Sequence, residues 1–379
     1  MISKNFKKVL FISHDATRTG APIVLIHLLR WLKNNTDIKF EILLKRGGEL
    51  IPEFESINPT HIMYKENIKR KLLRKLNLND ELSLIPLALI GKQYDLIYSN
   101  TITNGNLVSR LKEKAKKIIT HVHEMDSWIE RSGKDNWNEV VSQTTQFLAV
   151  SEPVRDCLIR RGIKKDKIEL LPECVSVPAT PSLTDRESIR EALGISKSAF
   201  VVGGGGAEVW RKGCDVFVQL AAATIYRQRS RDFHFIWLGS HPDKESSMWL
   251  KHDSKLLGCE ECIHCVGSVK NPEVYYSAMD TFVMTSREDP LPLVAIEAGM
   301  MGLPIICFNS AGGTADWVRE EAGYTVSYLD IAAMAEKIIL LSSDQNMLRK
   351  KGSNARIITQ SRFTIDIVGK KFAEYLYQA

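Results

Sequence analysis

One short segment of this chain concentrates side chains that could bind a sugar and a phosphate. It runs from residue 286 to residue 298 and reads Ser-Arg-Glu-Asp-Pro-Leu-Pro-Leu-Val-Ala-Ile-Glu-Ala. A buried-strand pattern over 281–285 precedes it, and the pattern of its second half predicts a helix over 292–301. Pro292 suits the first position of that helix, where its missing N–H costs nothing. The segment is therefore predicted to be a turn between a buried strand and a helix N-terminus.

The predicted turn offers groups for two sugars and a phosphate. The backbone N–H groups of Leu293 and Val294 would point out of the helix N-terminus, where a phosphate can bind. Glu297 lies one helical turn after Leu293 on the same face, and its carboxylate can accept hydrogen bonds from a vicinal diol such as that of a ribose. Asp289, on the loop before the helix, can do the same for a second sugar.

A pair of cations follows another strand pattern. The strand predicted over 200–202 leads into the glycine run 203–206 and then into Arg211-Lys212-Gly213. A dinucleotide-binding fingerprint would need a further glycine at position 208 or 209, where the chain has Glu208 and Val209, so a dehydrogenase is rejected. Arginine can make two hydrogen bonds to a phosphate and lysine acts as a point charge. Arg211 and Lys212 are therefore candidates to neutralise a diphosphate.

Further candidates lie at predicted strand ends in the first half of the chain. Gly20 and Ala21 end the loop after the first strand, and a glycine there lets a ligand approach the backbone without a Cβ in the way. His121 and His123 close another strand, and the alternation of side chains puts both on one face. We select His123 because it lies closer to the following loop. Glu124, the next residue, is a candidate for contact with an acceptor.

Strand and helix patterns alternate along the chain, which predicts a parallel α/β fold. Residues 172–181 contain three prolines and little periodicity, so they are the best linker candidate. We predict two doubly wound, Rossmann-like domains over 1–178 and 179–363, facing across a cleft. The last periodic helix is expected over 365–377. The predicted strands are 9–13, 39–44, 61–64, 95–99, 118–123, 147–150 and 168–171 in the first domain, and 200–202, 233–238, 263–266, 281–285, 303–308 and 324–327 in the second.

These residues also carry a family resemblance. The chain has an acid at 289, then seven intervening residues and Glu297-Ala298, with Gly-Leu-Pro-Ile at 302–305. This pattern resembles the signature of retaining glycosyltransferases with the GT-B fold, in particular family 4 (glycosyl transferases group 1). That family usually has Glu where this chain has Asp289, which is one methylene shorter. Arg211-Lys212-Gly213 resembles a second element of the family. The additional upstream cation of the family falls near Gly206 and is absent here.

The resemblance implies transfer of a sugar from a UDP-, GDP- or dTDP-sugar to a saccharide or lipid-linked acceptor, with retention. It implies no cofactor and no metal, an N-terminal acceptor domain, a C-terminal donor domain, and a last helix (364–379) that packs back on the first domain. By this resemblance Glu297 would contact the ribose, and the diphosphate would be bound by Arg211, Lys212, Leu293 and Val294. Asp289 would orient the transferred sugar, and His123 would contact the donor sugar near its reacting carbon. The Gly20–Ala21 loop would approach the donor.

Composition and charge narrow the class of protein. With 44% hydrophobic and 25% charged residues the chain resembles an ordinary globular protein, and no apolar run is long enough to span a bilayer. The N-terminus has no signal-peptide core, and seven scattered cysteines predict reduced thiols, so we expect a cytoplasmic protein.

The positive charge is concentrated in the first half of the chain. Residues 1–178 hold 29 of the 51 Lys and Arg but 21 of the 45 Asp and Glu. Basic clusters at 69–75 and 112–117 are either solvated helix faces or a surface for an anionic membrane, and leucines between the cations permit an amphipathic helix over 69–78. Nucleic acid is disfavoured, because basic and aromatic residues are not interleaved.

A metal site and two other functions are weighed against this interpretation. Cys259, Cys262 and Cys265, with His252 and His264 nearby, invite a zinc site, but four convergent ligands are needed and Cys265 is predicted to point inward from a strand. We therefore expect no metal. The Gly-Gly turn at 309–313 is either a plain turn or part of a donor pocket. A nucleotide-sugar epimerase or sugar phosphorylase on the same fold, and a non-catalytic binding subunit, stay open as alternatives.

Overall fold

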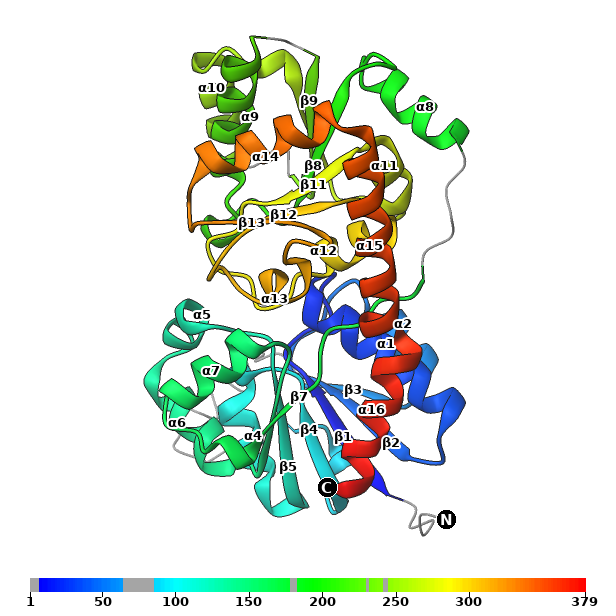
Figure 1. Ribbon diagram of the computed structural model, residues 1–379. Coiled ribbons are helices and arrows are strands. Elements are labelled where there is room, and N and C mark those ends of the chain that lie inside the picture. The colour runs from blue at the N-terminus through cyan, green and yellow to red at the C-terminus, as the bar shows by residue number, and fades with distance from the viewer. Residues whose placement is uncertain (1–6, 64–84, 178–182, 230–231, 241–244) are drawn as a thin grey trace. The chain divides into compact units, whose positions relative to one another are not determined.

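The computed structural model describes residues 7–63, 85–177, 183–229, 232–240 and 245–379. The chain divides into two compact units (Figure 1): unit 1 comprises 1–174 and 365–379, and unit 2 comprises 175–364. Each unit is a parallel sheet with helices, so the predicted α/β class is confirmed. The basic cluster at 69–75 and its amphipathic helix lie outside the described residues. None of the helices in the described ranges has both the length and the apolar sequence that a membrane span needs.

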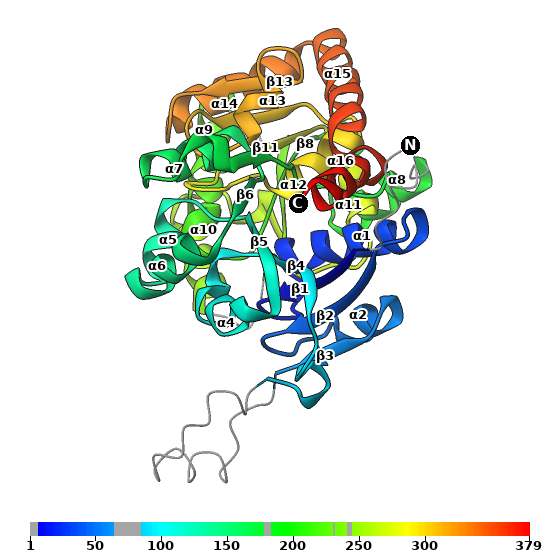
Figure 2. The same cartoon turned by 90° about the horizontal axis from the view of Figure 1, so that it is seen from below.

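Unit 1 is built on a seven-stranded parallel sheet in the order β3-β2-β1-β4-β5-β6-β7. The view from below shows β6, β5, β4, β1, β2 and β3 in that sequence (Figure 2). β1 is an apolar run buried almost throughout, as helices on both faces of a parallel sheet require, and β2 is buried likewise although it includes Glu41. The direction of winding reverses between β1 and β4, so the loops after these strands meet at one edge. The strands are β1 (Lys8–Ser13), β2 (Lys39–Leu44), β3 (Thr60–Ile62), β4 (Tyr94–Ser99), β5 (Ala115–Val122), β6 (Gln146–Ala149) and β7 (Ile168–Leu170).

The last helix of the chain belongs to unit 1 and lies beside α1 (Figures 1 and 2). A Cβ on Gly369 would lie 2.4 Å from the Trp31 ring, so the glycine permits the close approach. The indole N–H of Trp31 donates to Asp366 (3.0 Å), and the Phe372 ring packs 5.1 Å from that of Tyr98. The helices of unit 1 are α1 (Gly20–Asn35), α2 (Ile51–Ile57), α4 (Gly105–Leu111), α5 (Asp126–Arg131), α6 (Lys134–Gln143), α7 (Glu152–Arg160) and α16 (Ile365–Gln378).

Unit 2 is built on a six-stranded parallel sheet in the order β10-β9-β8-β11-β12-β13, and its winding reverses between β8 and β11. The strands are β8 (Phe200–Gly205), β9 (Phe233–Leu238), β10 (Ile263–Val266), β11 (Thr281–Met284), β12 (Ile305–Phe308) and β13 (Gly323–Val326). The helices are α8 (Leu183–Ala192), α9 (Cys214–Gln228), α10 (Glu245–Leu256), α11 (Pro272–Ala278), α12 (Leu293–Met300), α13 (Thr314–Val318), α14 (Ile331–Ser343) and α15 (Gln345–Phe363).

The glycine run after Val202 is part of a strand, so the prediction that this strand ends at 202 is wrong. β8 continues to Gly205, which pairs with Leu238 of β9, and neighbouring side chains fill the space beside Gly203 and Gly204. A Cβ on Gly203 would lie 2.1 Å from the sulfur of Met279, and one on Gly204 would lie 2.6 Å from the Phe217 ring. The glycines therefore serve packing of the core under the loop that follows.

Replacement of Gly204 by alanine should lower the free energy of unfolding by about 1–3 kcal/mol, because the added methyl overpacks the core beside Phe217. Urea unfolding followed by circular dichroism measures the loss. The matched control is Gly20→Ala, since a Cβ at Gly20 would meet nothing within 4 Å. Equal stabilities of the two variants would contradict the packing argument.

Candidate functional site

Two loops of unit 2 lie together where the winding of its sheet reverses. One follows β8 and the other follows β11. The N–H of Arg287 donates to the carbonyl of Arg211 (2.8 Å), and the Thr285 hydroxyl donates to the carbonyl of Gly213 (2.9 Å). Gly213 has a φ of +65°, and a Cβ on it would lie 2.0 Å from the Thr285 carbonyl oxygen, so only glycine allows this approach. Two motifs far apart in sequence are thus adjacent.

Arg287 fastens the second loop to the start of α9. Its guanidinium donates to both carboxylate oxygens of Asp215 (2.8 and 2.7 Å) and to the carbonyl of Trp210 (2.9 Å). This ion pair lowers the pKa of Asp215. A two-point arginine–carboxylate contact fixes direction as well as distance. Arg287 therefore holds the loop that carries the acidic residues against the loop that carries the cations.

Asp289 meets both predicted cations. Lys212 Nζ lies 2.5 Å from Asp289 Oδ2, and Arg211 Nη1 lies 3.3 Å from Oδ1. The Ser286 hydroxyl also donates to Oδ2 (3.1 Å). The Asp289 side chain is 7% exposed and that of Lys212 is 12% exposed, so this pair is largely removed from water. The carboxylate of Asp289 thus joins both cations at the meeting point of the two loops.

The N-terminus of α12 opens onto the same loop. The helix begins at Leu293, so the prediction of Pro292 as its first residue is wrong by one position, and Pro292 is the cap in an extended conformation (ψ 128°). Within the described chain, no acceptor lies within hydrogen-bond distance of the N–H groups of Leu293 and Val294. Glu297 accepts a hydrogen bond from the Tyr276 hydroxyl (2.8 Å), and burial raises the pKa of Glu297.

The glycine turn after β12 supports Asp289 from the other side. The N–H of Asp289 donates to the carbonyl of Ala311 (2.7 Å), and Gly312 pairs with Asp289 in a parallel bridge. Gly312 has a φ of +145°, and a Cβ there would lie 1.7 Å from the Asp289 carbonyl oxygen. A cavity of about 10 Å³, space for roughly one water, lies beside this contact. It is lined by Met284, Ser286, Asp289, Cys307, Phe308, Ala311, Gly312 and Thr314.

His121 and His123 lie on one face at the end of β5, with ring centroids 4.1 Å apart. Both ring nitrogens of His121 have partners in the core: Nδ1 lies 2.6 Å from the Tyr98 hydroxyl and Nε2 lies 2.9 Å from the Leu171 carbonyl oxygen. Burial lowers the pKa of His121 and of His123 to about 3, so both imidazoles are neutral at pH 7. His121 is therefore a structural residue of the sheet.

His123 is held by two polar side chains. Nδ1 lies 2.7 Å from Glu173 Oε1, and Nε2 lies 3.2 Å from Asn100 Oδ1. The Asn100 amide nitrogen donates to the carbonyl of Ala21 (2.7 Å), which turns Oδ1 toward the imidazole. Both ring nitrogens therefore face oxygen atoms, a carboxylate oxygen at Nδ1 and an amide oxygen at Nε2. The His123 side chain is 5% exposed, so a contact with a donor sugar would have to displace the Asn100 contact.

Glu124 is buried rather than presented at the surface. Its carboxylate accepts hydrogen bonds from the Thr101 hydroxyl and from the N–H groups of Ile102 (3.5 Å) and His123 (2.9 Å). Burial raises the pKa of Glu124 to about 7. The residue thus ties the loop after β4 to the end of β5, and its contact with an acceptor stays a prediction.

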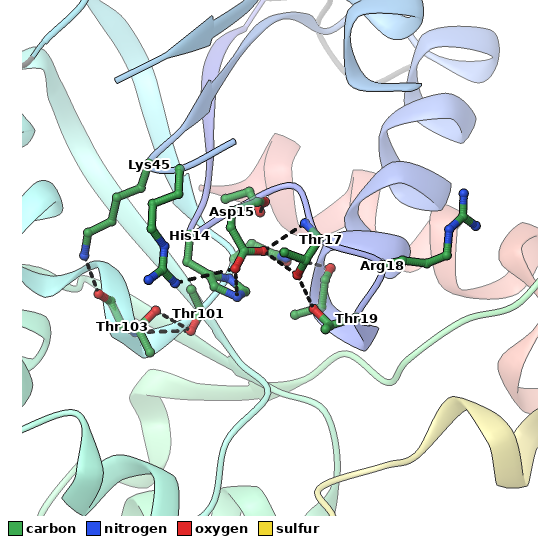
Figure 3. A network of polar contacts seen from close by, with 12 residues as sticks. His14, Asp15, Thr17, Arg18, Thr19, Lys45, Thr101 and Thr103 are labelled. Carbon is green, nitrogen blue, oxygen red and sulfur yellow. Dashed lines mark hydrogen bonds and ion pairs between the residues drawn. The ribbon is translucent and has the colours of Figure 1, made fainter. Parts of the chain in front are cut away.

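The loop after β1 is organised around Asp15 (Figure 3). Asp15 Oδ1 accepts hydrogen bonds from the N–H (3.1 Å) and the hydroxyl (2.9 Å) of Thr17. Asp15 Oδ2 lies 3.4 Å from His14 Nε2 and 3.5 Å from Arg46 Nη2. α1 begins directly after this loop at Gly20, with open space beside the glycine.

Both parts of the chain match known families. Residues 18–177 match the family described as Glycosyltransferase Family 4, and residues 197–344 match Glycosyl transferases group 1. This chain belongs to the glycosyltransferases of group 1 and family 4. Among solved structures, the glycosyltransferase is similar to Anabaena HepE in complex with UDP and glucose, with a TM-score of 0.83 and 19% identity over 98% of this chain and 100% of that one. The GT-B fold is thereby confirmed.

Curated relatives of the glycosyltransferase act in building polysaccharides. It is 25% identical over 228 residues to the capsular polysaccharide biosynthesis glycosyltransferase CapM of Staphylococcus aureus, covering 59% of each chain and thus less than two thirds of that relative's length. It is 23% identical over 306 residues to the UDP-Gal:alpha-D-GlcNAc-diphosphoundecaprenol alpha-1,3-galactosyltransferase of Escherichia coli, covering 75% of this chain and 76% of that one.

The cysteine cluster of the glycosyltransferase does not form the zinc site that its sequence invites. Cys259 and Cys262 are buried and Cys265 is exposed, so the prediction that Cys265 points inward is wrong. The reason is that β10 is an edge strand of the sheet, where one side chain in the strand can face solvent. Across the described ranges, no group of three or more His, Cys, Asp or Glu is placed to hold a metal ion.

His264 instead stacks on His234 of the neighbouring strand, with His264 Nε2 2.9 Å from His234 Nδ1. Burial and the second imidazole lower the pKa of His264 from 6.5 to about 4. The pKa of His264 is lower in the folded protein than in the unfolded chain, so protonation of His264 favours the unfolded chain. Its contribution to the free energy of unfolding is therefore complete above pH 6.5 and is lost as the pH falls toward 4.

Between pH 6.5 and pH 4, wild type should therefore lose about 1.4 kcal/mol of unfolding free energy per pH unit more than a His264→Gln variant does. Denaturant unfolding of both proteins at several pH values measures this difference in slope. Parallel slopes would contradict burial of a neutral imidazole at this position.

Five residues that shape these sites were not selected from the sequence: Lys45, Asn100, Glu173, Tyr276 and Arg287. Lys45 and Asn100 directly follow predicted strands, so the rule that ligands bind at the carboxyl ends of parallel strands could have selected them. Arg287 lies in the acidic motif at 286–298, but no role was predicted for it. Nothing in the local sequence of Glu173 or Tyr276 indicates their partners, because each partner is far away in the chain.

Proposed function

We propose that this glycosyltransferase moves a sugar from a nucleotide-sugar to a saccharide or lipid-linked acceptor, with retention of configuration and without a metal ion. The observation that carries the proposal is the meeting of Arg211, Lys212 and Asp289 beside the N-terminus of α12. Unit 2 would hold the donor, with Glu297 on the ribose and the two cations and the Leu293 and Val294 amides on the diphosphate. Unit 1 would hold the acceptor.

The chemistry follows from where charge develops. As the glycosidic bond breaks, negative charge grows on the leaving diphosphate, so fixed cations and a helix N-terminus stabilise the transition state more than the ground state. The fixed cations Arg211 and Lys212 suit this role, which a divalent ion fills in other enzymes. Asp289 would turn from its cations toward a hydroxyl of the transferred sugar once the diphosphate supplies the countercharge.

The additional cation that the family carries near Gly206 has no counterpart at that position. The aliphatic stem of Lys212 runs over Gly206, where a Cβ would lie 3.0 Å from Lys212 Cδ. Lys212 thus occupies the space that a longer side chain at 206 would need.

We infer that the donor is a UDP-sugar, because HepE binds UDP-glucose and the Escherichia coli relative is named for UDP-Gal. Thermal shift with UDP-, GDP- and dTDP-sugars tests the choice. A ligand at 100 times its Kd adds about 2.7 kcal/mol of stability, and we expect this only for UDP-sugars. A larger shift with GDP- or dTDP-sugars would contradict the choice of base.

The anomeric configuration of the product, measured by NMR in the presence of EDTA, tests retention and metal independence together. A retained product at an undiminished rate is expected. An inverted product would reject retention, and loss of turnover that Mg²⁺ restores would reject metal independence. Product formation without acceptor would favour an epimerase.

We further propose a cytoplasmic location, peripheral on an anionic membrane. Flotation with anionic vesicles tests this proposal, and binding that weakens as salt is added is expected.

A further inference from the structure

The loop after β2 in unit 1 carries two cations that the proposed donor chemistry does not use. Lys45 is partly buried, and its ammonium donates a hydrogen bond to the carbonyl of Thr103 (2.9 Å; Figure 3). Arg46, the next residue, has a side chain that is 70% exposed. Burial, then the charges of Arg46 and Arg110, lower the pKa of Lys45.

The cations outnumber the acid beside them. Among the residues that the structure describes, no carboxylate lies within ion-pair distance of Lys45 Nζ. Asp15 is the acid that contacts Arg46, at 3.5 Å, and its other oxygen accepts two hydrogen bonds from Thr17. A partly buried ammonium held only by a neutral carbonyl loses hydration without gaining a countercharge, which is costly. An anion bound at this place would restore the balance.

Hydroxyl groups from the neighbouring loop complete the surroundings. Thr103 Oγ1 lies 3.3 Å from Thr101 Oγ1, and both follow β4, whereas Lys45 and Arg46 follow β2 and Asp15 follows β1. These three strand ends meet where the winding of the unit 1 sheet reverses, which is where ligands of such sheets bind. Thr101 also donates to Glu124, so the cations share an edge with the predicted acceptor contact.

We propose that Lys45 and Arg46, together with the Thr103 hydroxyl, form a binding subsite for a phosphate group of the acceptor. A lysine point charge beside an arginine fork and a hydroxyl suits the tetrahedral oxygens of a phosphate. The acceptor is then a phosphorylated or diphosphate-linked saccharide rather than a neutral one. Naming the ligand as the acceptor rests on the proposed function, whereas the anion site itself rests on unit 1 alone.

The test uses the full chain saturated with UDP, so that the donor cations are occupied, and titrates inorganic pyrophosphate by calorimetry. We expect Lys45→Met and Arg46→Gln each to weaken pyrophosphate binding by a factor of ten or more. Lys39→Met is the matched control, because Lys39 is an exposed lysine at the opposite, N-terminal end of β2, and it should bind as wild type does. Equal affinity in wild type, Lys45→Met and Arg46→Gln would overturn the proposal.

Melting temperature separates a subsite from a structural clamp on the 101–104 loop. Without ligand, Lys45→Met should melt at or above the temperature of wild type, because the variant no longer buries a cation without countercharge. A lower melting temperature with unchanged pyrophosphate affinity would make Lys45 a structural clamp and overturn the proposal. Arg46→Gln, at an exposed position, keeps the binding test valid if Lys45→Met fails to fold.

Phosphatidylglycerol vesicles distinguish a phosphate on the acceptor from a membrane headgroup. If Lys45→Met and Arg46→Gln lose pyrophosphate binding but bind the vesicles as wild type does, the acceptor subsite is supported. Loss of vesicle binding alone overturns it in favour of a lipid surface. Failure of UDP to bind at all would instead reject the proposed function, and the difference in pyrophosphate affinity between the full-length wild type and its Lys45→Met and Arg46→Gln variants would still decide the anion site.

Discussion

Replacement of Lys212 by methionine should lower kcat by about 10²–10³-fold, the effect of removing one preorganised donor to a developing charge. Lys212 is the more buried of the two cations, and its ammonium would lie against the leaving diphosphate where little water screens it. Steady-state kinetics with the donor identified by thermal shift measures the change. The matched control is Lys251→Met, an exposed lysine on α10 of the same unit, which should keep the wild-type rate.

The variant also removes a partner from the largely buried carboxylate of Asp289, so a loss of stability must be separated from a loss of catalysis. The double variant Lys212→Met/Asp289→Asn removes both charges. We expect it to recover melting temperature relative to Lys212→Met while its rate stays low. A single variant that keeps kcat within about threefold of wild type would reject Lys212 as a stabiliser of the leaving group, since such a role is worth at least tenfold.

Replacement of Glu297 by alanine should weaken UDP binding by about 10- to 100-fold, because hydrogen bonds to a charged carboxylate contribute about 1.5–3 kcal/mol. Tyr276 orients this carboxylate, so Tyr276→Phe should weaken UDP by about 2- to 10-fold, the cost of one neutral hydrogen bond. Glu336→Gln, on an exposed face of α14, serves as the control and should bind UDP as wild type does.

A 2′-deoxy analogue of UDP makes the assignment of Glu297 specific to the ribose. The analogue should bind wild type more weakly than UDP does, and Glu297→Ala should not distinguish the two nucleotides. Isothermal titration of both ligands against both proteins completes the cycle. If the variant still discriminates against the deoxy analogue as strongly as wild type, Glu297 does not contact the 2′-hydroxyl.

The sequence predicted the strands well because parallel strands buried on both faces are continuous apolar runs bounded by turns. The prediction that Arg211, Lys212 and Asp289 serve one donor site came from their chemistry and from the family resemblance, and the structure places the three side chains in contact. The sequence-based prediction missed the strand character of Gly203–Gly205, because glycine is ordinarily a turn residue and the reason for it here is the bulk of Met279 and Phe217.

Contacts between distant residues could not be predicted from local pattern. His123 and Glu173 are 50 positions apart, and the pairing of Arg287 with Asp215 spans 72. The direct ion pair of Asp289 with both cations was not foreseen either, because sequence spacing places a carboxylate near a sugar without saying what it contacts when the sugar is absent. Such partners depend on the order of strands in the sheet, which a single sequence does not contain.

The most direct test of the central claim is a crystal structure of the protein with a UDP-sugar. The account predicts diphosphate oxygens within hydrogen-bond distance of Lys212 Nζ, the Arg211 guanidinium and the N–H groups of Leu293 and Val294, with the ribose diol on Glu297. Asp289 would have left its cations for a hydroxyl of the sugar. A nucleotide bound elsewhere, with Asp289 still paired to Lys212, would contradict it.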